Sequence, residues 1–153
     1  MRDSTVHQGG CLCGAVRFEA LGTPKRVGAC HCRYCQLRSG SAFGVSVYFP
    51  EDDVKVLQGE LKSYQYQTET GNTTVNRFCT ECGSTVLWKV GALPEYTGTA
   101  GGSYDPPTFW YDLQREVFKR SSADFVHLTA PESHPTIPYY DPQVPEADRL
   151  KGG

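Results

Sequence analysis

The sequence predicts a mainly β fold, and its composition supports this in two ways. Of 153 residues, 16 are Gly and 10 are Pro, and they are scattered along the chain. The stretches between them are rich in Val, Thr, Tyr and Phe and lack helical periodicity. Because these residue types favour strands and Gly and Pro mark turns, we expect short strands joined by tight connections.

Several segments have the β-rich composition of a strand. Two of them flank the turn-forming stretch Glu69-Thr70-Gly71-Asn72, so we expect a hairpin there whose second arm leads directly into Cys79. The strands that we expect are Ala15–Leu21, Phe43–Tyr48, Val54–Leu57, Leu61–Thr68, Thr73–Phe78, Thr85–Val90, Glu116–Lys119 and Phe125–Leu128.

Only one short helix is expected, over Arg33–Arg38, and it ends at Ser39-Gly40, where Gly suits a helix C-terminus. Gly98–Ser103 has the composition of a loop. Pro131–Pro145 is punctuated by proline and should lie extended over the surface. The length fits a single domain over 1–153, with a core at about 8–130 and an extended C-terminal tail at 131–153.

Charge and targeting signals narrow the class of protein. Fifteen Lys and Arg residues against 17 Asp and Glu give a net charge of −2, which disfavours nonspecific binding to nucleic acid. The opening stretch has no apolar segment of a signal peptide, and no apolar run reaches the length of a membrane span. We therefore expect a cytoplasmic protein without membrane or nucleic-acid partners.

The seven cysteines all fall into short clusters. An odd number would leave one thiol over in a disulfide framework, and a reducing cytoplasm keeps cysteines as thiols. Metal binding or thiol chemistry is therefore the leading interpretation. The clusters are Cys11-x-Cys13, Cys30-x-Cys32-x-x-Cys35 and Cys79-x-x-Cys82.

The two outer pairs predict a closed, structural zinc site. Zinc in such sites takes four ligands, often as two short-spaced pairs from distant parts of a chain. Side chains at i and i+2 of a flat strand lie too far apart to share a tetrahedral ion, so the chain must bend at the first pair. The site would consist of Cys11, Cys13, Cys79 and Cys82; the alternatives are buried free thiols or a redox pair.

The middle cluster holds three cysteines, Cys30, Cys32 and Cys35, with no fourth one to close a site. Three protein ligands and an exchangeable position are typical of a catalytic zinc, although a second closed site remains an alternative. His31 lies between two ligands and should point away from the metal, whereas His7 or a carboxylate could still supply a ligand.

Three thiolates would give a zinc site a formal charge of −1, which makes it a weak activator of water. Such a site suits a soft sulfur ligand better. A substrate thiol bound there would lose its proton and become a nucleophile for a carbonyl or a similar electrophile.

The clusters and their flanking residues resemble the family of glutathione-dependent formaldehyde-activating enzymes. The resemblance rests on Gly9–Phe18, on Cys30–Cys35 with Ser39-Gly40-Ser41, and on Arg77–Ser84. It implies a β-tent fold, in which several coiled antiparallel sheets are built around a four-cysteine zinc site. It also implies that Cys11, Cys13, Cys79 and Cys82 bind the structural zinc and that Cys30, Cys32 and Cys35 bind the catalytic one.

The family's named reaction is the reversible addition of glutathione to formaldehyde, a carbon–sulfur lyase activity. We expect this chain to act on glutathione or a related thiol, with Arg33 and Arg38 as the first candidates for its carboxylates and Arg77 and Lys89 as others. Ser122-Ala123-Asp124-Phe125 stands where members often carry an Arg-x-Pro-Trp-like element. Alternatives are therefore a zinc enzyme of the same fold acting on another molecule, and a zinc-stabilised module that binds a protein.

Overall fold

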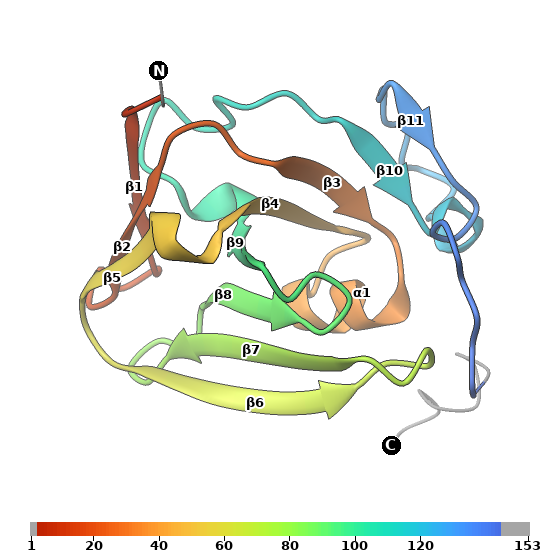
Figure 1. Cartoon of the computed structure of the whole chain (residues 1–153), viewed down its shortest axis with the longest axis horizontal. Helices are drawn as coiled ribbons and strands as arrows, with labels where there is room; N and C mark the ends of the chain where they lie inside the picture. Colours follow the sequence, from red (N-terminus) through yellow and green to blue (C-terminus); the bar gives the residue numbers. More distant parts are fainter. Residues whose placement is uncertain (1–2, 145–153) are drawn as a thin grey trace.

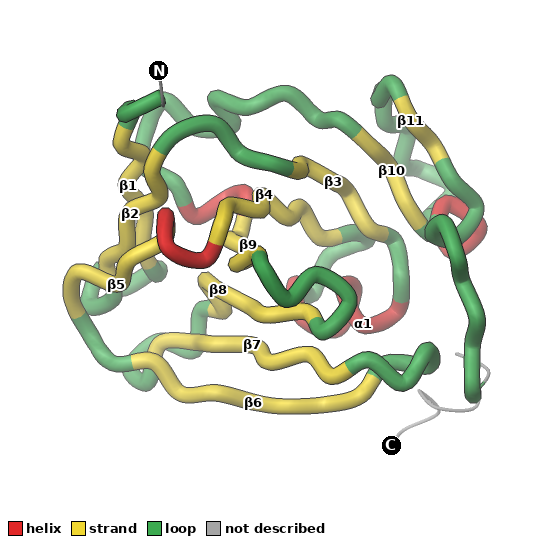
Figure 2. The backbone as a smooth tube through the Cα atoms, in the orientation of Figure 1, coloured by secondary structure: helices red, strands yellow, loops and turns green. Residues whose placement is uncertain are grey.

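The computed structural model describes residues 3–144, which fold into two β-sheets and one short α-helix. Figures 1 and 2 show strands distributed along the whole described chain, with the helix against one end of the larger sheet. The mainly β prediction is confirmed.

The smaller sheet has three antiparallel strands in the order β1-β2-β5. They are β1 (Val6–Gly10), β2 (Arg17–Leu21) and β5 (Val54–Gln58). In β2 every second residue is buried, which is the pattern of a strand with one face against a core.

The larger sheet has eight strands in the order β11-β10-β3-β4-β9-β8-β7-β6. Pairing is antiparallel from β3 to β6, whereas β10 runs parallel to both β3 and β11. The strands are β3 (Arg26–Cys30), β4 (Gly44–Pro50), β6 (Leu61–Gln67), β7 (Thr73–Cys79), β8 (Thr85–Val90), β9 (Tyr96–Ala100), β10 (Arg115–Val117) and β11 (Glu132–Ser133).

The main core joins the two sheets. Phe18 of β2, Phe49 of β4 and Leu87 of β8 are almost fully buried in one cluster, together with valines from β3, β4 and β8. Each such side chain contributes about 1.5–3 kcal/mol through the hydrophobic effect. This core fixes the relative positions of the segments that carry the cysteines.

The helix α1 (Arg33–Ser39) occupies the predicted place. The Cys32 side chain caps its first turn by accepting a hydrogen bond from the Cys35 amide, and Gly40 ends it in the left-handed conformation. Three single turns of 3-10 helix complete the secondary structure: η1 (Glu51–Asp53), η2 (Gly101–Ser103) and η3 (Lys119–Ser121).

Four strands were not predicted, namely β1, β3, β9 and the two-residue β11, and the first three contain glycine. Position 98 of β9 is a glycine because the Trp88 indole packs directly on it. A Cβ at this position would lie 2.1 Å from the indole Nε1. The prediction of a loop over Gly98–Ser103 is therefore wrong for its first half, which belongs to β9, and the second half forms η2.

Phe125–Leu128, predicted as a strand, forms none, and the Phe125 side chain is 81% exposed. The segment lacks a neighbouring strand with which to pair, so its β-forming composition has no effect. The hairpin of β6 and β7 is confirmed, with Leu61 paired to Cys79 and Gln67 to Thr73.

The segment predicted as a surface tail, Pro131–Pro145, contributes β11 and then reaches the tip of that hairpin (Figure 1). The Gln143 and Val144 amides donate hydrogen bonds to the Glu69 carbonyl, at 2.6 and 3.2 Å. Residues 145–153 of the predicted tail lie outside the described part. Within residues 3–144 no helix has the length and apolar character needed to cross a membrane.

Candidate metal centres

The outer cysteine pairs meet in space although 66 positions separate Cys13 from Cys79. The Sγ atoms of Cys11, Cys13, Cys79 and Cys82 all lie within 4.8 Å of one another. Cys11 and Cys13 are 3.6 Å apart, and Cys13 and Cys79 are 3.8 Å apart. Tetrahedral zinc with Zn–S bonds of about 2.3 Å requires sulfurs roughly 3.8 Å apart, so the donor set fits such an ion.

Two similar turns bring these sulfurs together. The Gly14 amide donates to the Cys11 carbonyl and the Gly83 amide to the Cys79 carbonyl, at 3.1 and 2.9 Å. Both glycines have a φ near +80°, where a side chain would be strained. The bend that the short spacing of Cys11 and Cys13 requires is therefore made by a glycine turn.

Polar groups around this cluster donate to sulfur. The Val16 amide lies 3.2 Å from Cys11 Sγ and the Glu81 amide 3.3 Å from Cys79 Sγ. Hydrogen bonds from the Ser84 hydroxyl and amide lower the pKa of the Cys82 thiol to about 5. These contacts favour the thiolate form, which is the form that binds a metal.

The middle cluster is built from one continuous segment. Cys30 ends β3, Cys32 caps α1, and Cys35 lies in the first turn of that helix. Their Sγ atoms also lie within 4.8 Å of one another, and no fourth His, Cys, Asp or Glu of residues 3–144 joins the group. The structure thus brings together both sets of cysteines that could bind a metal ion.

His31 lies away from this group, as expected from its position between two of the cysteines. Its ring is fully buried, and Nε2 lies 3.1 Å from a carboxylate oxygen of the buried Glu116 in β10. The Ser133 hydroxyl donates to the same carboxylate, and the Lys119 ammonium lies 3.7 Å from it. This network anchors the cysteine segment to the C-terminal strands.

Sequence reasoning did not identify Glu116 as a partner of this segment. The sequence predicts only a strand at this residue, because no local pattern connects it with His31, 85 positions away. Parallel pairing of β10 with β3 is what places the two side chains together. The only sequence signal for this contact is a charged residue at a position where the strand pattern expects a buried side chain.

Arg38, in the last turn of α1, lies against both Trp88 and Cys35. Its guanidinium carbon is 3.7 Å from the centre of the Trp88 ring. Its Nη2 is buried, and a Cβ at Gly44 would lie 2.5 Å from it and 3.3 Å from the Cys35 Cβ. Gly44 therefore leaves the space in which this guanidinium approaches the cysteine.

The three sulfurs strongly influence one another. Hydrogen bonds from the Cys30 and Cys32 thiols, and next the Arg38 guanidinium, hold the pKa of the Cys35 thiol well below its usual range. The same contacts among the thiols, together with burial, raise the pKa of Cys30. These contacts favour the thiolate form of Cys35, which also has the Arg38 cation beside it.

An aromatic cluster covers the other side of this segment. Cys32, Tyr34 and Phe118 are buried together, and Tyr66, Ile137 and Tyr140 pack against them. Tyr140 is held by Arg120, which donates to its hydroxyl at 3.1 Å and stacks on its ring. The C-terminal segment therefore forms part of the wall around the three cysteines.

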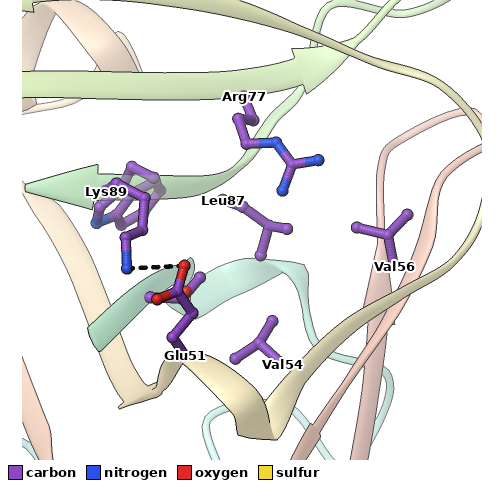
Figure 3. A pocket seen from close by; sticks show the side chains of 8 residues that line it. Glu51, Val54, Val56, Arg77, Leu87 and Lys89 are labelled. Carbon is purple, nitrogen blue, oxygen red and sulfur yellow. Dashed lines mark ion pairs between the residues drawn. The ribbon is translucent and has the colours of Figure 1, made fainter. Parts of the chain in front are cut away.

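The other candidate residues lie at three different places in the fold. Arg33 is exposed on α1, whereas Arg77 and Lys89 line a separate cavity (Figure 3). His7 stacks on Trp110 with ring centres 3.6 Å apart, and its Nε2 lies 3.0 Å from the Gly22 carbonyl. His7 is therefore not a ligand of the three-cysteine group in this structure.

Comparison with known proteins agrees with this geometry. A solved crystal structure, of a Rhodobacter sphaeroides protein studied as a structural genomics target, is 26% identical. The match covers 65% of this chain and 88% of that chain, with a TM-score of 0.52. Residues 6–121, which contain all seven cysteines, match the family described as glutathione-dependent formaldehyde-activating enzyme, and the chain belongs to that family.

Proposed function

We propose that this protein is a zinc-dependent carbon–sulfur lyase that adds a thiol such as glutathione to formaldehyde or a related small electrophile, reversibly. In the forward direction the thiol sulfur bonds to the carbonyl carbon, and the carbonyl oxygen takes up the proton that the thiol has lost. No oxidant, reductant or further co-reactant is needed.

The observation that carries the proposal is the difference in donor number between the two cysteine groups. One has four sulfurs and suits a closed structural zinc; the other has three, with no further ligand among residues 3–144. A zinc ion held by Cys30, Cys32 and Cys35 would supply a site at which a substrate thiol is stabilised as its thiolate.

The side chains around the three cysteines support this role. Arg38 places a cation beside Cys35, which offsets part of the negative charge that three thiolates bring together. The exposed Arg33 and the partly buried Arg38 are cations on the same helix. We assign them to the carboxylates of the incoming thiol, since glutathione carries two.

The aromatic wall supports the exclusion of water from the reacting atoms. Tyr34, Phe118 and Tyr140 present apolar surface beside Cys32. Phe118 and Tyr34 belong to the stretch that the family match covers, whereas Tyr140 lies beyond its end at residue 121. The identity of the electrophile, and whether the thiol is glutathione, therefore depend in part on residues outside the matched range.

The test uses cobalt in place of zinc, because Co²⁺–thiolate charge-transfer bands report on sulfur ligands. Glutathione is titrated into the cobalt-substituted protein, with S-methylglutathione as the control that has the same carboxylates but no free thiol. We expect two metals per chain and a new thiolate band that saturates with glutathione and not with its S-methyl derivative.

A companion variant separates substrate binding from the metal site. Arg33→Gln should raise the glutathione concentration at half-saturation about tenfold, the loss of one charge-assisted contact, and leave the metal content at two. One metal per chain, or spectra that no thiol alters, would refute the proposal. A response to another thiol alone would keep the chemistry and replace the substrate.

A further inference from the structure

A cavity of about 190 Å³ lies between the smaller sheet and β7, β8 and β9, and no cysteine lines it (Figure 3). Its volume equals the share of about six water molecules in the liquid, so a small organic molecule fits inside. The side chains that decide its chemistry are Glu51, Val54, Val56, Arg77, Leu87 and Lys89.

The cavity lies on the opposite face of the larger sheet from the three cysteines. Leu87 and Lys89 of β8 line it, and Arg77 is paired directly with Leu87. Trp88, which lies between them in sequence, also contributes to the lining, but strand alternation directs its indole toward the other face, where Arg38 stacks on it. A ligand in this cavity is therefore separated from Cys35 by the sheet.

The charges at the cavity leave one cation available. Lys89 Nζ lies 3.3 Å from a Glu51 carboxylate oxygen and donates to the Pro94 carbonyl at 3.0 Å. The half-buried Arg77 points toward the cavity in Figure 3 and makes no ion pair with any residue of the described range 3–144. A planar guanidinium in this state is complementary to a carboxylate, which it binds with two parallel hydrogen bonds.

The apolar part of the lining determines what kind of group can accompany the carboxylate. Val54 and Val56 of β5 present hydrocarbon across the cavity from Arg77, and Leu87 lies beside it (Figure 3). A multiply charged anion such as phosphate would have only one unpaired cation and an apolar wall, which disfavours it. One negative charge and a short aliphatic chain match both parts of the cavity.

We propose that this cavity is a binding site for a short-chain aliphatic monocarboxylate. The carboxylate accepts hydrogen bonds from the Arg77 guanidinium, and the hydrocarbon chain packs against Val54, Val56 and Leu87. The site is independent of the reaction proposed for the three cysteines. Because the ligand binds only the folded chain, it stabilises the protein by mass action.

The experiment is calorimetric titration of the zinc-loaded full chain with butyrate, with acetate supplying the carboxylate alone and n-butanol the chain alone. Butyrate should bind more tightly than either and should raise the melting temperature. Arg77→Gln should weaken butyrate binding about tenfold or more, through loss of a charged hydrogen-bond pair. Lys55→Gln removes a cation of β5 whose side chain leaves the strand on the opposite side from Val54 and Val56, so it should leave the affinity unchanged.

A second variant keeps the test decisive if Arg77→Gln fails to fold, which circular dichroism would reveal. Val56→Phe fills the cavity and retains Arg77, and it should abolish butyrate binding. Binding of butyrate that is equal in wild type and Val56→Phe, an equal loss in Lys55→Gln and Arg77→Gln, or no heat of binding in the wild type would each overturn the proposal.

Discussion

The two cysteine groups differ in how the chain builds them. The four-cysteine group joins two glycine turns that lie far apart in sequence, and three of its members, Cys11, Cys13 and Cys82, are partly or largely exposed. The three-cysteine group lies within six consecutive residues and is enclosed by elements that come much later, β10 and the C-terminal segment. The first arrangement ties the fold together, and the second depends on a fold that already exists.

Metal removal should give the largest effect, because it breaks this long-range link. A structural zinc site contributes on the order of 10 kcal/mol to folding, comparable to the whole stability of a small domain. Chelation at neutral pH should therefore abolish near-ultraviolet circular dichroism and the cooperative thermal transition. Retention of both after complete loss of metal would contradict a structural role for the four cysteines.

Substitution of single ligands should separate the two groups. Cys35→Ser should lower the metal content by one per chain and reduce turnover more than about 100-fold. That is more than the loss expected when only a residue that hydrogen-bonds to a metal ligand is removed. Its thermal transition should stay cooperative. Cys82→Ser, the matched change in the other group, should unfold the chain; equal stability of the two variants would remove the distinction.

The buried pair of His31 and Glu116 beside the three cysteines predicts a smaller effect. Glu116→Gln keeps the shape but leaves buried hydrogen-bonding groups poorly satisfied, at a cost of about 2 kcal/mol. Denaturant unfolding of the zinc-loaded protein measures this. Glu132→Gln is the control, since that carboxylate pairs with Arg115 while 52% exposed; a comparable loss there would show that burial is not the cause.

The exposed pair of Arg17 and Asp105, which follows the first glycine turn, should have the smallest effect. Asp105 is 46% exposed, so Asp105→Asn should cost less than about 1 kcal/mol and less still at high salt. The Arg17 guanidinium lowers the pKa of the Asp105 carboxyl in the folded protein. Its contribution is therefore fully present above the pKa of the unfolded chain, near 4, and is lost as the pH falls through the lower pKa of the folded protein.

Unfolding curves of wild type and Asp105→Asn at neutral pH and near pH 3 measure this contribution. The difference between the two proteins should be smaller at the lower pH. An undiminished difference there would show that the side chain acts through packing rather than through its charge.

Local sequence patterns were sufficient where structure is local. The hairpin of β6 and β7, the helix that Gly40 ends, and the membership of both cysteine groups follow from turn chemistry and spacing. Gly98 and Glu116 show what such patterns miss. Gly98 is a glycine inside a strand because the Trp88 indole of the paired strand β8 packs on it. Glu116 matters because the parallel pairing of β10 with β3 brings it to His31.

Phe125–Leu128 illustrates the opposite error. Its residues favour a strand, but β-propensity expresses fit to a neighbouring strand and a half-buried surface, and the segment has neither. The position of Arg38 against Trp88 and Cys35 was equally inaccessible, since it depends on Gly44, which opens the next strand.

The compact placement of Cys30, Cys32 and Cys35 also sets an order of events during synthesis. These thiols are complete as a set once residue 35 has been made, well before Cys79 and Cys82 exist. At about 5–20 residues per second, the growing chain carries this trio for several seconds without the four-cysteine partner set and without Glu116 or Tyr140 to enclose it. Of the two groups, the three-cysteine one is therefore the first to be complete during synthesis, whereas the four-cysteine group is complete only once Cys82 has been made.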